Sequence, residues 1–197
     1  MHSRLLATIC VVTLLGWTAR AQDQPQKTLF CFISAHDLVD ASAPRFEQYP
    51  VKTSPPSSPA QLDLRSNPIA RSYRTVIRRE MSQGANFAGQ YRVAIWGCGS
   101  SCAQFAVVNL KSGRVITVNG VDTVSGVHLG ADDFLPGTDS GAWGFRFKKD
   151  SRLLVLVGTI NENDAKQGAF YYLLKGDGLE LVHKTIAARN TCQEERD

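Results

Sequence analysis

The chain has 197 residues, 43% of them hydrophobic, which is enough for one domain with a sizeable core. Its formal net charge is +4, from 22 Lys and Arg against 18 Asp and Glu. No basic run is interleaved with aromatic residues, so the composition argues against a nucleic-acid-binding protein.

The first 21 residues have the pattern of a secretory signal peptide. Arg4 precedes a short apolar run, Leu5–Trp17, and the small-x-small site Ala19-Arg20-Ala21 follows. The run is shorter than the roughly 20 residues that cross a bilayer, so we expect cleavage before Gln22 and no membrane insertion afterwards. The sequence therefore predicts a single periplasmic or secreted domain, 22–197.

Cysteine usage supports this expectation. Cys10 lies inside the predicted signal peptide, which leaves Cys31, Cys98, Cys102 and Cys192 in the exported domain. An even number of cysteines in an exported chain predicts two disulfides, although four cysteines allow three connectivities. Proximity in the sequence favours Cys98–Cys102, and the second bridge would then join Cys31 to Cys192.

The N-terminal part of the predicted domain has few regular elements. Thr28–Ser34 is apolar and aromatic enough for a short strand. Arg45–Val51 alternates loosely and contains a proline near its end, which favours an edge strand or an extended segment. Thr53–Ala60, rich in Pro and Ser, predicts an extended connector on the surface of the domain.

A single helix is predicted over Ser66–Gly84. Ser66 or Asn67 can cap it, Pro68 suits its first position, and Gly84 suits its end. Apolar residues at helical spacing form one face, namely Ile69, Tyr73, Val76, Ile77 and Met81.

The other faces of this helix carry Arg71, Arg74, Arg78 and Arg79. One interpretation is an anion-binding face. The other, which we prefer at this stage, is a solvated surface whose late cations complement the helix dipole.

Strands separated by turns are predicted beyond the helix. They are Gln90–Trp96, Ala103–Asn109, Arg114–Val118, Trp143–Phe147, Arg152–Ile160, Ala169–Leu174 and Leu179–Lys184. Tyr91–Val118 and Phe145–His183 share an outline typical of a propeller blade, but two blades cannot close a propeller. We therefore predict an α+β domain, mainly β, in which an antiparallel meander packs as a sandwich or partial barrel under one covering helix.

One stretch resembles a known family. The order Asn86-Phe87-Ala88-Gly89-x-Tyr91, then Trp96-Gly97-Cys98-Gly99 with Cys102, then Asn109 before a Gly113 turn, is similar to the signature of a family of uncharacterised exported bacterial proteins. The resemblance covers about Phe46 to Val118. It implies export and a β-rich fold, and it implies no catalytic residue.

Cys98 and Cys102 could also form a redox-active dithiol or a Cu(I) site. A redox dithiol usually has a two-residue spacing at a helix N-terminus, whereas these cysteines flank a turn between strands. Cys98 could further act as a nucleophile with His128 or His183, but no local signature of a cysteine hydrolase surrounds it. We predict a structural disulfide.

The loop Gly120–Ala142 is long for a compact domain and carries Asp122, His128, Asp132 and Asp133. Clustered carboxylates suit a hard cation such as Ca²⁺, and long loops often bind partners. The spacing matches no cation-binding loop, and Asp with Gly is also ordinary turn chemistry, so we predict no metal and no cofactor.

Two functions remain open from the sequence. The preferred hypothesis is a non-enzymatic binding or inhibitor-type module of the bacterial envelope, whose partner is an envelope protein or a glycan. Trp96 and the acidic loop are its candidate ligand-binding residues, although a tryptophan at a strand end is by default part of the core rim. The rival is an envelope hydrolase or metal-assisted enzyme that uses the 120–142 loop. No pattern indicates the oligomeric state.

Overall fold

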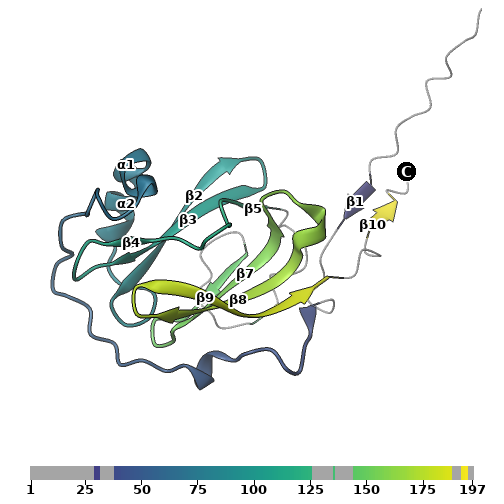
Figure 1. Ribbon diagram of the computed structural model, residues 1–197, viewed down its shortest axis with the longest axis horizontal. Coiled ribbons are helices and arrows are strands. Elements are labelled where there is room, and N and C mark those ends of the chain that lie inside the picture. The colour runs from purple at the N-terminus through teal and green to yellow at the C-terminus, as the bar shows by residue number, and fades with distance from the viewer. Residues whose placement is uncertain (1–28, 32–37, 126–134, 136–143, 188–191, 195–197) are drawn as a thin grey trace, which may run out of the picture.

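The computed structural model describes residues 29–31, 38–125, 135, 144–187 and 192–194 (Figure 1). Eight strands form one antiparallel sheet that is not closed, and two short helices accompany it. The predicted class, α+β and mainly β, is confirmed.

The strands of the large sheet are β2 (Tyr91–Gly99), β3 (Cys102–Asn109), β4 (Val115–Ile116), β5 (Val124–Ser125), β6 (Phe145–Phe147), β7 (Leu153–Ile160), β8 (Gln167–Lys175) and β9 (Gly178–Ile186). Their order is β2-β3-β5-β7-β8-β9, with β4 also paired to β3 and β6 to β7. A separate antiparallel pair joins β1 (Leu29–Cys31) to β10 (Cys192–Glu194).

The two predicted units are the two halves of this sheet, and β5 joins them. The prediction that Val124 and Ser125 belong to the long loop is wrong. Val124 is fully buried and stands opposite both Ala103 of β3 and Ile160 of β7. A strand of two residues is too short to show an alternating pattern, so its sequence could not reveal it.

The main core lies on the face of the sheet that the two halves share. Side chains of β3 and of β6–β8 belong to one buried cluster. Within it, the rings of Phe105 and Phe145 meet at 5.1 Å between centroids, and those of Phe87 and Phe147 at 6.3 Å. These edge-to-face contacts tie residues of the first half to residues of the second half.

The opposite face of the sheet is covered by different segments in its two halves. Over β3, Ala106 and Val108 pack in one cluster with Ile77 of the helical segment. Over β7 and β8, a second cluster contains Leu153, Val155 and Tyr171 together with Leu38 and Phe46 of the N-terminal segment.

Every residue of β7 is therefore buried, because both faces of this strand are covered. Double coverage also explains why Arg152–Ile160 is a continuous apolar run in the sequence rather than an alternating one.

The predicted single helix is two helices, α1 (Pro68–Ser72) and α2 (Arg74–Met81). Asn67 caps α1 by accepting a hydrogen bond from the Ile69 N–H at 2.9 Å, as predicted. Between the helices, Tyr73 leaves helical geometry with φ −113° and ψ 24°, and its ring lies 4.7 Å from that of Trp96. A local helical period cannot indicate such a tertiary contact.

The predicted orientation of the helix is confirmed. Ile77 is fully buried and Val76 is half-buried against the sheet, whereas Arg74 and Arg78 are exposed.

The predicted extended segment Arg45–Val51 is wrong in its first half. Phe46–Gln48 forms a 3₁₀ turn, because the Phe46 ring is buried in the cluster that covers β7. Its end is extended and forms a single bridge from Pro50 to Ser151. Thr53–Ala60 has neither helix nor strand, as predicted for a connector.

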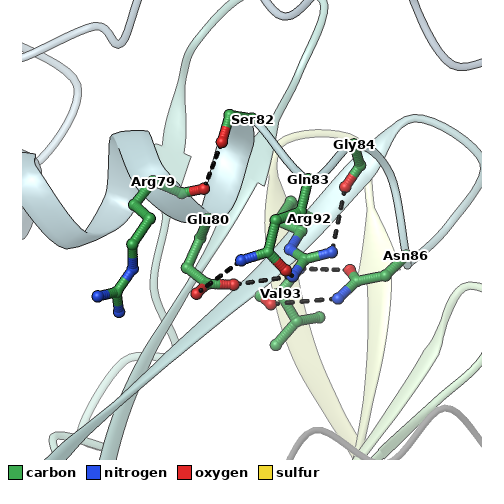
Figure 2. Close-up of polar contacts among 8 residues, drawn as sticks. All are labelled: Arg79, Glu80, Ser82, Gln83, Gly84, Asn86, Arg92 and Val93. Carbon is green, nitrogen blue, oxygen red and sulfur yellow. Dashed lines mark hydrogen bonds and ion pairs between the residues drawn. The ribbon is translucent and has the colours of Figure 1, made fainter.

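A polar network joins α2 to the edge strand β2 (Figure 2). Arg92 makes an ion pair with Glu80 at 2.8 Å and also donates to the Gln83 side chain. The Asn86 side chain accepts from the Val93 N–H at 2.8 Å and donates to the Val93 carbonyl at 3.3 Å. This amide thereby pairs backbone groups that an edge strand leaves open to another chain.

The turn between β6 and β7 is hydrogen-bonded to the N-terminal segment and to the loop that precedes β2. The buried Ser151 hydroxyl donates to the Phe46 carbonyl at 2.9 Å, and the Ser151 carbonyl accepts from the Ala88 N–H at 3.2 Å. The Gly89 N–H donates to the Lys149 carbonyl at 2.7 Å. Gly89 has φ +77°, and a Cβ there would lie 2.6 Å from a backbone oxygen, so only glycine fits.

We predict that Ser151→Ala destabilises the protein by about 1–3 kcal/mol, because it removes the partner of a buried carbonyl. A urea titration followed by tryptophan fluorescence measures the change, with Ser58→Ala, an exposed serine of the connector, as control. Equal stability of the two variants would show that the Ser151 hydroxyl does not connect the segments.

Candidate functional site

Trp96 lies in β2 and is half-buried. Its indole Nε1 donates to Gln104 on the neighbouring strand at 3.0 Å, and its ring lies against Tyr73. Both contacts are those of a residue at the rim of the core, where the helical segment meets the sheet.

Of the four residues named in the predicted acidic loop, the structure describes Asp122. Asp122 is exposed just before β5, and its backbone N–H donates to the Asn161 side chain at 2.8 Å. His128, Asp132 and Asp133 lie outside the described residues. Within the described ranges, no group of three or more His, Cys, Asp or Glu is placed to hold a metal ion.

Cys98 and Cys102 form a disulfide at the tip of the β2–β3 hairpin, with Cα atoms 5.2 Å apart. The bridge closes the turn that contains Gly99 and Ser101, both of which have positive φ. Cys98 is thus not a free thiol. The backbone register places Cys31 opposite Cys192 in the β1–β10 pair, and the predicted second disulfide remains a prediction.

A polar cluster that the sequence pattern does not predict joins β9 to the N-terminal segment. Asp40 Oδ2 lies 2.8 Å from His183 Nε2 and accepts from the Thr185 hydroxyl at 3.2 Å. Asp40 Oδ1 accepts from both the N–H and the hydroxyl of Ser42, at 2.8 and 2.6 Å. The carboxylate is therefore hydrogen-bonded at both oxygens.

These hydrogen bonds hold the pKa of Asp40 well below its ordinary value of 3.8. The Ser42 hydroxyl contributes most, followed by the Ser42 N–H and then His183, because each of them favours the charged carboxylate. Asp40 is consequently an anion in the folded protein at neutral pH.

The cluster does not have the geometry of a nucleophile–histidine–aspartate relay. In such a relay the carboxylate and the nucleophile contact different imidazole nitrogens. Here Asp40 and the Thr185 hydroxyl both approach His183 Nε2, at 2.8 and 3.5 Å. An ionised carboxylate only accepts, so Nε2 carries the proton and cannot take one from Thr185.

Beside this cluster is a pocket of about 340 Å³, here called the Phe46 pocket. It opens where the N-terminal segment crosses β8. Its lining is Leu38, Val39, Asp40, Ala43, Pro44, Arg45, Phe46, Glu47, Leu135, Lys148 and Tyr171.

The floor of the Phe46 pocket is uncharged. Tyr171 is almost fully buried, and its burial, together with the charge of Asp40, raises its pKa to about 12. At the rim, Lys148 pairs with Glu47 at 2.9 Å and lies 5.2 Å from the centre of the Phe46 ring. That lysine holds the pKa of Glu47 below its ordinary value.

The sequence contains one indirect signal for this site and one misleading signal. Asp40 and Ser42 have the spacing of a local side-chain turn, but His183 is 143 residues away. Strict alternation along Leu179–Lys184 would put His183 on the same face as Leu179 and Leu181, and the structure does not. A bulge at Val182 shifts the register, so His183 stands opposite Tyr171 and Leu181 opposite Tyr172.

Comparisons with protein-family models, with curated proteins and with solved structures find no match to this chain. Neither helix of the described residues has the length and apolar character needed to cross a membrane.

We predict that Asp40→Asn lowers stability at pH 7 and that its difference from the parent shrinks as the pH falls below about 4. Because folding depresses the pKa of Asp40 from 3.8, its contribution is present above that value and lost as the carboxylate is protonated. Urea unfolding in steps from pH 7 to pH 2 measures this, with Asp122→Asn as the charge-matched control. A difference that does not change with pH would contradict this linkage.

We predict that Cys98→Ser/Cys102→Ser remains folded. The disulfide closes a short loop, so removing it should lower the free energy of unfolding by less than the roughly 3 kcal/mol that chain entropy gives for a 15-residue loop. Thermal unfolding tests this expectation. Peptide mapping without reduction tests the pairing, and a peptide linking Cys31 to Cys98 or Cys102 would show that the predicted connectivity is wrong.

Proposed function

We propose that this protein is an exported, disulfide-containing binding module of the bacterial envelope, of the inhibitor type. We propose further that the Phe46 pocket receives an apolar side chain of an envelope protein. Export is supported by the N-terminal sequence pattern and by the Cys98–Cys102 disulfide, since such bonds persist in oxidising compartments. The pocket is the observation on which the proposed binding depends.

The size and chemistry of the Phe46 pocket favour a polypeptide ligand. Its volume of about 340 Å³ is at the small end of ligand pockets, and its floor of Leu38, Phe46 and Tyr171 is apolar. Its rim carries two cationic and two anionic side chains, namely Arg45, Lys148, Asp40 and Glu47. Balanced charges around an apolar floor suit a neutral peptide with one inserted side chain better than a polyion.

A glycan is less well matched to this pocket. Sugars stack on exposed aromatic faces, whereas Phe46 and Tyr171 are 5% and 1% exposed. A protein partner needs only the apolar edges that these rings present, together with hydrogen-bonding groups at the rim.

A non-enzymatic role is supported by the neighbouring cluster. Asp40 is hydrogen-bonded at both oxygens, and the His183 nitrogen that faces Thr185 already donates to Asp40. These groups connect β9 to the N-terminal segment, and Asp40 also lines the pocket.

We predict that a peptide library displayed on phage and selected on the purified protein is enriched in sequences with a central apolar side chain. Val39→Asp should weaken binding of a selected peptide at least tenfold, because it puts a charge on the pocket wall. Val39 is 74% exposed, so the substitution spares the fold. Calorimetric titration measures the change.

Leu181→Asp is the matched control, because this residue is also exposed, at 46%, and does not line the pocket. It should bind the peptide as the parent does. Equal losses in the two variants, selection of polar peptides only, or tighter binding of envelope glycans than of any peptide would each overturn the proposal.

A further inference from the structure

The two helices carry a surface, here called the basic face, that the proposed function does not use. It consists of Arg65, Arg71, Arg74, Arg78 and Arg79. All five side chains are exposed, and residues 65–79 contain no Asp or Glu. Within the described part of the chain, none of these arginines forms an ion pair.

The nearest carboxylate along the helix is already paired. Glu80 lies on the side of α2 that faces β2 and makes its ion pair with Arg92, both side chains being 14% exposed. Figure 2 shows the Arg79 guanidinium pointing away from this network. The charge of the basic face is therefore not neutralised by its own helix.

Two arginines of the basic face contact nearby backbone carbonyls. The Arg71 guanidinium donates to the Leu64 carbonyl at 3.1 Å, and that of Arg74 approaches the Arg71 carbonyl at 3.4 Å. The first of these contacts connects the helices to the segment that precedes them. A guanidinium group has five N–H donors, so those not used in these contacts can bind a phosphate in a bidentate manner.

A groove of about 580 Å³ adjoins the basic face, between α2 and the segment that precedes α1. Its lining combines the apolar residues Pro59, Ala60, Leu62, Leu64 and Met81 with the polar residues Gln61, Arg78 and Ser82. The segment is held by hydrogen bonds from the Ala60 N–H to the Leu110 carbonyl and from the Asp63 N–H to the Gly113 carbonyl. The groove thus has a fixed wall.

We propose that the basic face and this groove together bind anionic phospholipid at a membrane surface. The arginines would contact the phosphates, and the groove would hold the apolar part of a lipid next to its headgroup. Arginines commonly bind either nucleic acids or anionic phospholipids. The groove favours phospholipid, because a nucleic acid has phosphates but no acyl chain to place in it. This proposal does not depend on the Phe46 pocket, because that pocket is formed by other residues.

Co-sedimentation of the purified protein with vesicles tests the proposal. We expect binding to vesicles of equal parts phosphatidylglycerol and phosphatidylcholine, little binding to phosphatidylcholine alone, and a decrease as salt rises. Arg74→Gln/Arg78→Gln should weaken binding on the order of tenfold, because both arginines face the membrane.

Lys166→Gln/Lys184→Gln is the control, because it removes the same charge from exposed sites away from the basic face. It should stay within about twofold of the parent. If circular dichroism shows that the arginine variant is unfolded, Arg71→Gln/Arg79→Gln replaces it, and the same decrease in vesicle binding is expected. Equal losses in the arginine and lysine variants would overturn the proposal, as would equal binding to both vesicle types.

Two further measurements test the kind of ligand. Tighter binding of a DNA duplex than of anionic vesicles would show that the surface is a nucleic-acid site instead. In calorimetric titrations, a single-chain phosphatidylglycerol should bind at least tenfold more tightly than glycerol 3-phosphate. Equal affinities for these two probes would show that the groove holds no acyl chain.

Discussion

The structure depends on the hydrogen bonds at the turn between β6 and β7, which ends at the buried Ser151. The Ser151 hydroxyl donates a hydrogen bond to the Phe46 carbonyl of the N-terminal segment. The carbonyls of Ser151 and Lys149 accept hydrogen bonds from the N–H groups of Ala88 and Gly89, in the loop before β2. Ser151, Ala88 and Gly89 are buried, so their polar groups must find partners within the protein. One short turn thereby fixes the N-terminal segment and the start of β2 relative to β7.

This constraint determines which surfaces are available for function. The N-terminal segment covers the β7–β8 half of the sheet, and the Phe46 pocket lies where this cover is incomplete. The two helices cover the β2–β4 half and turn their arginines to solvent. The two proposed binding surfaces are therefore the outer sides of the two covering segments. Each segment covers the sheet with its inner side, so the residues of its outer side can differ without changing the packing against the sheet.

Several features were predictable from the sequence because their causes are local. The cap at Asn67, the buried Ile77, the strands around the cysteine turn and the Cys98–Cys102 bridge all follow from residues within a few positions of one another. Two elements were not predictable in this way. The break between the helices at Tyr73 accompanies a contact of its ring with Trp96. The two residues of β5 form a strand because they pair with β3 on one side and with β7 on the other.

The sequence by itself determined the mainly β class, the main strands and the arginines of the helical segment, since alternation and helical period are visible over short stretches. The tertiary structure alone decided the Phe46 pocket and the cluster of Asp40 with His183. These groups are 143 residues apart, and the bulge at Val182 turns His183 to the face opposite the one that alternation indicates. A register shift of one residue reverses a side chain's direction, and packing against neighbouring strands sets that register.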